Sequence, residues 1–225
     1  MLAARGVGVH LVCLTRGEGG ELGKPPLSDR ERLGEVRERE MVCAVGKLRG
    51  KSLTFLDYVD PVVGPDEALY LPAHDPAMLA GQIIASIKQT GAQVVLTHGS
   101  NGEYGHPAHK LVHTTALIAV ASLGESSPLL YSFAAAYPNH PYPRLTNPDD
   151  PADIVVDVAA FLDQKEAAAL CHATQTALFV RRRSEMAGRK LSVREVLLTH
   201  ESFRRQWPAS AAAAADDPFA RWLGQ

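Results

Sequence analysis

Apolar segments with the character of strands alternate along the chain with segments that have helical periodicity. The apolar runs at residues 7–15, 52–58 and 93–98 have the length and β-branched content of buried strands, and a loop rich in glycine or proline follows each. Between them, apolar residues recur at helical spacing over residues 32–50 and 76–90. This alternation predicts an α/β fold, a Rossmann-like and mostly parallel sheet with helices on both faces. Ligands in such folds bind beyond the carboxyl ends of the strands.

Capping residues mark where the predicted helices begin. Ser28 and Glu31 have the spacing of a capping box, and Asp75 followed by Pro76 is typical of an N-cap and a first helical residue. A third helix is expected to start near Pro107. The other predicted elements are strands at 129–133 and 153–157 and an Ala-rich helix over 158–176. We therefore predict one α/β domain over residues 1–206, followed by a C-terminal tail at 207–225 that contains the low-complexity run 210–217.

Composition narrows the class of protein. The 225 residues carry 23 Lys and Arg against 25 Asp and Glu, a net charge of −2, so the basic excess of nucleic-acid or anionic-membrane binders is missing. No apolar run approaches the roughly 20 residues that a membrane span requires, and no secretory signal is recognisable. The three cysteines are widely spaced without a Cys-x-x-Cys pair, which predicts free core thiols in a reducing cytoplasm. These features favour a cytoplasmic protein that neither binds nucleic acid nor spans a membrane.

The candidate chemistry is a group of histidines after the third predicted strand. His98 ends that strand, and His106, His109 and His113 then follow along the start of the predicted helix. Imidazoles along one helical edge at the carboxyl rim of a sheet are typical of a metal site or a proton-transfer site. A His-x-x-His pair also arises by chance, because a helix start accommodates neutral histidines that have no function.

Three segments of the chain resemble one enzyme family. They are LTRGEGGELG at 14–23, VLTHGSNGEYGHPAHKLVH at 95–113 and KEAAALCHATQ at 165–175. Together they are similar to the zinc-dependent N-acetylglucosaminyl de-N-acetylases of the LmbE/PIG-L family, over about residues 1–206. The resemblance implies Zn²⁺ as the cofactor and a hydrolase that removes an acetyl group from the amide of a GlcNAc-containing or related small molecule.

The resemblance also assigns roles to single residues. His109 matches the zinc ligand borne on the family's helix. Tyr104 matches the tyrosine that donates to the oxyanion, and His106 matches the histidine that stabilises the oxyanion or acts as an acid. Arg16, Glu18 and Asn101 match positions that bind the substrate, which we expect to be of the amino-sugar type.

The sequence departs from the family pattern in two places. The family takes two further zinc ligands and a general base from a His-Pro-Asp-Asp loop after its first strand, and this motif does not occur here. We therefore expect the first strand to be absent, with residues 1–6 as the end of the helix that follows it, and with unpaired strand edges that promote association of copies. His98 or Asp60 could replace a ligand, but their spacing does not indicate it. Ala108 stands where many relatives have an aspartate, which leaves the tautomer of His106 unspecified.

Two functions remain open at this point. One is the zinc-dependent deacetylase, and the other is a catalytically silent remnant of the family that acts as a binding or interaction protein. Other polar residues are interpreted as structural: His10 and His140 as ordinary strand and loop histidines, 181–183 as a solvated charge run, and 149–150 as a turn. His172 is either a pocket residue or a hydrogen-bonded core histidine, and the sequence favours neither interpretation.

Overall fold

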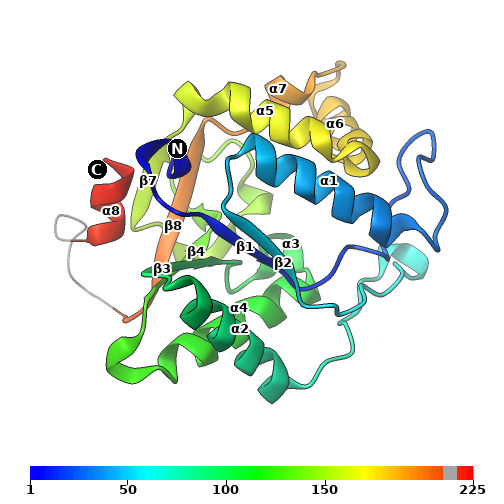
Figure 1. Cartoon of the computed structure of the whole chain (residues 1–225). Coiled ribbons are helices and arrows are strands. Elements are labelled where there is room, and N and C mark those ends of the chain that lie inside the picture. Colours follow the sequence, from blue (N-terminus) through cyan, green and yellow to red (C-terminus); the bar gives the residue numbers. More distant parts are fainter. Residues whose placement is uncertain (210–216, 225) are drawn as a thin grey trace. The chain divides into compact units, whose positions relative to one another are not determined.

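The computed structural model describes residues 1–209 and 217–224 of the chain (Figure 1). Contacts divide the chain into two compact units. Unit 1 comprises Met1–Ala68 and Val158–Thr199, and unit 2 comprises Leu69–Asp157 and His200–Gln225. Both units combine strands with helices, so the predicted α/β class is confirmed.

Unit 1 is built on one parallel β-α-β motif. β1 (His10–Cys13) and β2 (Ser52–Phe55) pair in parallel as a two-stranded sheet, and α1 (Leu33–Lys47) connects them. The later part of the unit consists of α5 (Leu162–Cys171), α6 (Ala173–Ala187) and α7 (Val193–Val196). α1 packs along α5, as Figure 1 shows. Each strand lies within a longer predicted run, β1 in the middle of 7–15 and β2 at the start of 52–58.

A disulfide joins α1 to α5. It links Cys43 to Cys171, whose Cα atoms are 5.8 Å apart. One turn away, the buried Glu40 carboxylate accepts hydrogen bonds from the backbone N–H and the hydroxyl of Thr174, both at 2.8 Å. The prediction of free thiols is wrong for this pair and holds for Cys13. The two cysteines are 128 positions apart, so only the packing of α1 on α5 brings them together.

Two local predictions in unit 1 are also wrong. α1 begins at Leu33 with Arg32 as its N-cap and without a side-chain cap, because the Ser28 hydroxyl donates to the Asp29 carbonyl instead of capping the helix. The Ala-rich segment is two helices rather than one. His172 separates α5 from α6 with φ −85° and ψ 59°, outside the helical region.

Unit 2 contains a mixed four-stranded sheet in the order β3-β4-β8-β7. β3 and β4 pair in parallel, whereas β8 runs antiparallel to both β4 and β7. A separate parallel pair is formed by β5 and β6. The elements are α2 (Pro76–Thr90), β3 (Val94–Thr97), α3 (Gly102–Gly105), α4 (Pro107–Ala121), β4 (Leu129–Phe133), β5 (Ala135–Ala136), β6 (Asn147–Pro151), β7 (Ile154–Asp157), β8 (His200–Trp207) and α8 (Pro218–Leu223). Asp149 and Asp150, which were interpreted as a turn, lie within β6.

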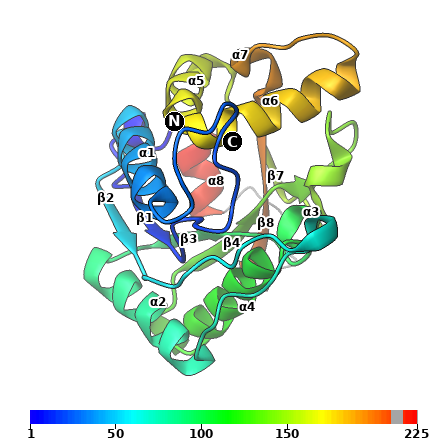
Figure 2. The ribbon, with the colours of Figure 1, turned by 90° about the vertical axis from the view of Figure 1, so that its right-hand side faces the viewer.

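The core of unit 2 lies between two helices and the sheet. α2 and α4 run side by side (Figure 2), and Ile87, Val120 and Leu130 form a buried apolar cluster between them and β4. The predicted cap of α2 is confirmed, since the Asp75 carboxylate accepts from the N–H groups of Ala77 and Met78. This packing fixes the carboxyl end of β3 and the start of α4, where the histidines lie.

The C-terminal part of unit 2 packs on the sheet. Phe219 of α8 is 1% exposed, and its ring lies 4.7 Å from that of Tyr131 and 5.2 Å from that of Phe203. The Tyr131 hydroxyl donates to the carboxylate of Asp217, which caps α8. Of the predicted tail, residues 210–216 and 225 lie outside the described residues, and the division of the chain at 206 stays a prediction.

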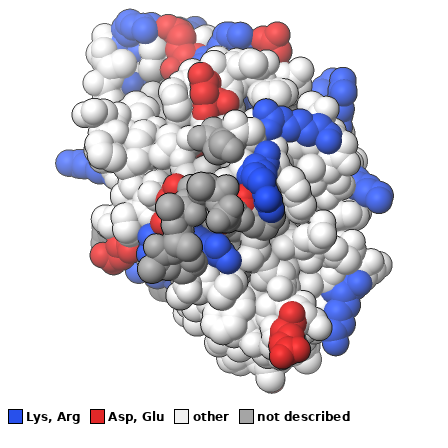
Figure 3. Space-filling model, turned by 90° about the vertical axis from the view of Figure 1, so that its left-hand side faces the viewer, with Lys and Arg blue, Asp and Glu red and all other residues white. Residues whose placement is uncertain are grey.

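The surface carries charges of both signs. On the face drawn in Figure 3, the described basic side chains are interspersed with acidic ones rather than gathered into one continuous area. Among residues 1–209 and 217–224, no helix combines the length and apolar character needed to cross a bilayer.

Candidate metal centre

The loop between β3 and α4 carries the predicted histidines. His98 follows the last residue of β3, and Pro107 is the first residue of α4. His106 is the N-cap of α4, and its Nδ1 accepts a hydrogen bond from the Ala108 backbone N–H at 3.2 Å. The helix then presents His109 one turn inside its N-terminus, so the strand and the helix converge on one short polar loop.

Glu103 links two of the histidines. Its Oε2 lies 3.1 Å from Nδ1 of His98 and 2.5 Å from Nδ1 of His109. The His98 and His109 rings are stacked, with centroids 3.8 Å apart and planes 16° apart. One potential ligand atom from each of the three side chains falls within 4.8 Å of the others. This arrangement of two imidazoles and a carboxylate is the centre of the candidate site.

The electrostatics of the cluster favour an ionised glutamate. Burial alone would raise the pKa of Glu103, but hydrogen bonds from His109 and His98 outweigh it and hold the pKa well below its usual range. Burial lowers the pKa of His98, so this imidazole is neutral at pH 7. An ionised carboxylate only accepts hydrogen bonds, so Nδ1 of each ring carries the hydrogen that Glu103 binds.

His106 has a defined tautomer. Burial, followed by the proximity of His109 and His98, lowers its pKa to about 4, so the ring is neutral at pH 7. Since Nδ1 accepts from the Ala108 N–H, the hydrogen of the neutral ring must reside on Nε2. The expectation that Ala108 leaves this tautomer unspecified is therefore wrong, because the backbone of Ala108 specifies it.

The rings of His106 and Tyr104 extend the cluster. His106 stacks on His109 with a centroid distance of 4.4 Å, so His109 has a neighbouring imidazole on both sides. The Tyr104 ring meets those of His106 and His109 edge-on, at 5.7 and 5.6 Å. Tyr104 is 56% exposed, which leaves it accessible to a ligand from solvent. The structure thus brings together all three residues that the resemblance placed in the catalytic machinery.

The predicted substrate-binding residues lie in different places. Asn101 belongs to the same loop and is bound to β6, where its Nδ2 donates to the Asp149 carboxylate at 2.6 Å. Arg16 and Glu18 belong to unit 1. There Arg16 forms ion pairs with Glu38 at 2.5 Å and Asp57 at 2.6 Å, and its guanidinium lies over the ring of Phe55.

The remaining acidic and imidazole candidates have structural partners. Glu18 accepts from the backbone N–H of Asp60 at 3.0 Å, so both residues belong to one loop contact of unit 1. His113 is 8% exposed, and its Nδ1 lies 2.9 Å from the carbonyl oxygen of His98. It therefore supports the backbone that carries His98.

Glu103 was missed by the sequence analysis. A signal for it exists in the sequence, since a carboxylate six residues before His109 and five after His98 lies in the loop that both residues flank. Nothing in that spacing fixes the direction of the side chain. Two histidines and one glutamate are a ligand set found in catalytic zinc sites, where three protein ligands leave a position open. The donor chemistry of this cluster therefore fits a zinc ion.

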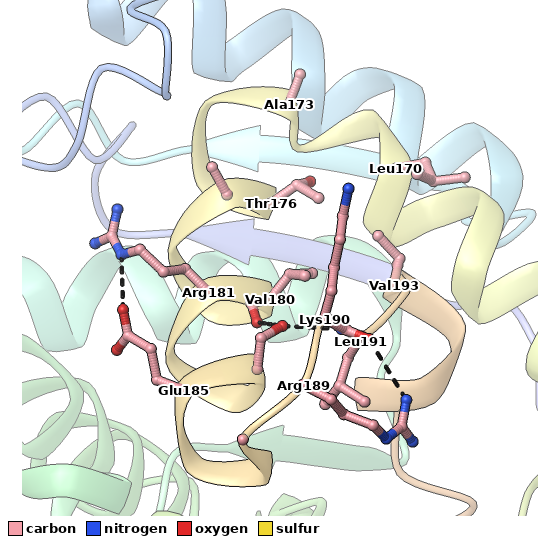
Figure 4. Close-up of a pocket in the computed structure, with 13 residues that line it drawn as sticks. Leu170, Ala173, Thr176, Val180, Arg181, Glu185, Arg189, Lys190, Leu191 and Val193 are labelled. Atoms are coloured by element: carbon pink, nitrogen blue, oxygen red, sulfur yellow. Dashed lines mark hydrogen bonds and ion pairs between the residues drawn. The ribbon is translucent and has the colours of Figure 1, made fainter.

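A hollow lies in unit 1. It is an open groove of about 870 Å³ along α6, drawn in Figure 4. Arg181 and Glu185 form an ion pair at 4.0 Å on one side of it, and Lys190 extends along it. The other lining residues shown there are mostly small or aliphatic, among them Ala173, Val180, Leu191 and Val193. None of its lining residues is a histidine or a cysteine, so the groove offers no alternative set of zinc ligands.

Comparison with known proteins places this chain in a family. The family model for PIG-L, GlcNAc-PI de-N-acetylase, matches residues 1–120, which include β1, β3 and the whole histidine loop. A curated relative from Acidothermus cellulolyticus, named 1D-myo-inositol 2-acetamido-2-deoxy-alpha-D-glucopyranoside deacetylase, is 30% identical over 215 residues. The alignment covers 78% of this chain and 72% of the relative.

Two solved structures share the fold. The 4-carboxy-2-hydroxymuconate hydratase GalB superposes with a TM-score of 0.60 at 20% identity, covering 95% of this chain and 90% of that one. The N,N'-diacetylchitobiose deacetylase from Pyrococcus horikoshii superposes with a TM-score of 0.59 at 15% identity, covering 91% and 75%. Because a hydratase and a deacetylase have the same fold, this likeness establishes architecture only. On the family match and the curated relative, the chain belongs to the PIG-L family of GlcNAc-PI de-N-acetylases.

Proposed function

We propose that the protein is a zinc-dependent hydrolase that removes the acetyl group from the amide of a GlcNAc-containing or related small molecule. The observation that carries the proposal is the cluster of His98, Glu103 and His109 beside Tyr104 and His106. The curated relative is named as a deacetylase of a 2-acetamido sugar, which supports both the reaction and the class of substrate.

Zinc would be held by His98, Glu103 and His109. When bound, the ion supplies a Lewis acid that polarises the amide carbonyl and activates water for attack. The chain prepares the ligands for this task, because Glu103 already brings the two Nδ1 atoms to one carboxylate oxygen, at 3.1 and 2.5 Å. Loading the site through the Nδ1 atoms would move the hydrogen of each neutral ring to Nε2, so zinc binding would require no loss of a proton from the rings or from the ionised Glu103.

Tyr104 and His106 would stabilise the negative charge that develops on the carbonyl oxygen. The hydroxyl of Tyr104 is a hydrogen-bond donor on an exposed side chain next to the cluster. His106 donates from Nε2, because the Ala108 N–H occupies its Nδ1. Two neutral donors of this kind stabilise an oxyanion without requiring a change of protonation state during the reaction.

We assign Arg16, Glu18 and Asn101 to the substrate side of the site. Asn101 lies in the histidine loop, where the contacts with Asp149 hold its amide in place. Arg16 uses Nε and Nη1 in its two ion pairs, and Nη2 remains for a hydroxyl group of a sugar. This part of the proposal rests on the resemblance to the family.

The test combines metal content with acetate release. The chain is stripped with a chelator, reloaded with zinc and assayed with 1D-myo-inositol 2-acetamido-2-deoxy-alpha-D-glucopyranoside. We expect one zinc per chain and release of acetate, both lost in His109→Ala. The control is His74→Ala, since the His74 ring forms its hydrogen bond within its own loop, to the carbonyl of Pro72. A folded chain that takes up no zinc and releases no acetate would contradict the proposal and favour a silent binding protein.

A further inference from the structure

Asn147 is a buried amide that the sequence analysis did not single out. It is the first residue of β6, 44 positions after Glu103, and its side chain is fully buried. We propose that Asn147 is a positioning residue that sets the orientation of Glu103, and through it the geometry of the metal ligands. The proposal deepens the proposed function and rests on it, but its test includes a readout that needs no metal.

The donor side of Asn147 acts on the Glu103 carboxylate. Its Nδ2 lies 3.2 Å from Oε1 of Glu103, and the backbone N–H of Gly99 donates to the same oxygen at 3.1 Å. These two donors occupy Oε1, while Oε2 meets His98 and His109. The carboxylate is therefore held at both oxygens, which prevents it from rotating away from the imidazoles. Carboxylates that bind metals are commonly held by such outer hydrogen bonds.

The acceptor side of Asn147 acts on the Glu103 backbone. Its Oδ1 accepts from the N–H of Glu103 at 3.0 Å and from the N–H of Asn101 at 3.2 Å. Glu103 has φ 56° and ψ −79°, a sparsely populated conformation for a residue with a side chain. Strained residues of this kind persist only where their surroundings hold them, and here one amide binds both the backbone and the side chain.

The orientation of the Asn147 amide is itself fixed. Nδ2 also lies 3.2 Å from the carbonyl oxygens of Phe133 and Ala134, which would repel Oδ1 if the amide were flipped. Gly99 passes so close that a Cβ at this position would lie 2.0 Å from Cγ of Asn147. A glycine is therefore required there, and a larger residue would displace the amide.

Asp150 offers a matched comparison in the same strand. It is 5% exposed and binds the same loop, accepting from the N–H and the hydroxyl of Ser100, both at 2.9 Å. It also accepts from the hydroxyl of Ser132 at 3.1 Å. None of its hydrogen bonds reaches Glu103. Asp150 and Asn147 therefore both hold the loop. Of these two side chains, only Asn147 contacts the Glu103 carboxylate.

The experiment compares Asn147→Asp with Asp150→Asn in the full chain. Asn147→Asp keeps the shape of the side chain but replaces its donor with an acceptor facing Glu103 Oε1 and two carbonyls. We measure zinc affinity by competition with a chromophoric chelator, thermal unfolding by circular dichroism, and the histidine ring nitrogens of the metal-free chain by ¹⁵N NMR. The ring spectrum reports which nitrogen carries the hydrogen, and loss of stability alone does not change it.

We expect Asn147→Asp to weaken zinc binding by about 10- to 100-fold, the range found when outer hydrogen bonds of metal ligands are removed. It should also shift the ring nitrogens of His98 and His109. Asp150→Asn should lower the unfolding temperature while leaving zinc affinity and both ring signals near their wild-type values. Gly99→Ala provides a second variant in case Asn147→Asp does not fold, since it displaces the amide without replacing any side chain of the cluster.

The proposal is overturned if Asn147→Asp and Asp150→Asn weaken zinc binding equally, or if neither Asn147→Asp nor Gly99→Ala changes the His98 and His109 ring signals. A wild-type chain that binds no zinc would contradict the proposed function instead. The ring spectra of the metal-free variants would still decide whether Asn147 positions Glu103.

Discussion

The loops that follow β1 and β3 both come after a parallel strand, and both lie in segments that resemble the family. Their charged side chains, however, have different kinds of partner. After β1, Arg16 pairs with Glu38 and Asp57, and Glu18 accepts from the backbone of Asp60. After β3, one oxygen of the Glu103 carboxylate faces two imidazoles rather than a guanidinium, and the other is held by the Gly99 N–H and by Asn147. The first loop uses its charges to hold its own unit together. The second gathers groups that can bind a metal.

A second comparison is between the groove of unit 1 and the histidine cluster of unit 2. The groove of unit 1 has a volume of about 870 Å³ and is lined mostly by aliphatic and cationic side chains. The histidine cluster brings two imidazole rings to one ionised carboxylate, with one potential ligand atom of each side chain within 4.8 Å of the others. The chemistry of the donor atoms therefore locates the candidate centre better than the size of a hollow does.

The largest effect on zinc affinity is expected when Glu103 is replaced by glutamine and compared with the same replacement at Glu18. Glu103→Gln removes a ligand and the acceptor that orders His98 and His109, so zinc affinity should fall by more than about 100-fold and turnover should be lost. Glu18→Gln is the matched control and should retain zinc, because its partner is a backbone N–H of unit 1. Competition titration and acetate release measure both. Equal retention of zinc in the two variants would contradict the assignment of the metal ligands to the loop after β3.

Removal of the Tyr104 hydroxyl should affect turnover without affecting the metal. If Tyr104 donates to the developing oxyanion, Tyr104→Phe should lower kcat by about 10²- to 10³-fold. Zinc affinity should stay the same, since Tyr104 contacts the cluster through its ring. Tyr70→Phe serves as the control because Tyr70 is similarly exposed, at 50% against 56%. A kcat for Tyr104→Phe within threefold of wild type would exclude the hydroxyl from the reaction.

Removal of the disulfide should lower the stability of unit 1 without affecting the candidate metal centre of unit 2. Replacing Cys43 and Cys171 together with serine should lower the free energy of unfolding by about 2–4 kcal/mol, because the crosslink no longer restricts the unfolded chain. Urea denaturation under non-reducing conditions measures this loss, with Cys13→Ser as the control. Zinc affinity of the folded double variant should be unchanged. If removal of the disulfide weakened zinc binding, the separation of the two regions would be wrong.

The smallest effect is expected at Arg16. Its two acidic partners have 44% and 73% exposed side chains, so Arg16→Gln should lower stability by about 1 kcal/mol or less. Zinc affinity should not change. A rise in KM at constant zinc affinity supports the assignment of Arg16 to the substrate side, and an unchanged KM would remove Arg16 from it.

Much of the fold followed from local patterns. β3, α2 and α4 were predicted because an apolar run, an Asp-Pro start and a glycine-rich loop that leads into a proline are all signals within a few residues. β8 was missed because its His200–Trp207 segment is mostly polar, with Phe203 and Trp207 as its apolar residues, and contains no β-branched side chain. Its place in the sheet comes from antiparallel pairing with β4 and β7, far away in the sequence.

The candidate site was predictable in part. His106, His109 and Tyr104 are one short motif, and the resemblance to the family identified them together. Glu103 lay inside the same motif, but the direction of its side chain depends on a positive φ and on Asn147, 44 residues later. The tautomer of His106 depends on a backbone contact of the helix start. Properties that arise from contacts between distant segments were therefore beyond the reach of spacing and composition.

The central claim is that His98, Glu103 and His109 form a zinc site in this chain. Its most direct test is the metal content of the stripped and reloaded protein, measured by inductively coupled plasma mass spectrometry for the wild type and for Glu103→Gln. The account predicts one zinc per chain in the wild type and a large loss in the variant. Wild-type protein that is folded but takes up no zinc on reloading, or a variant that retains a full equivalent, would contradict it.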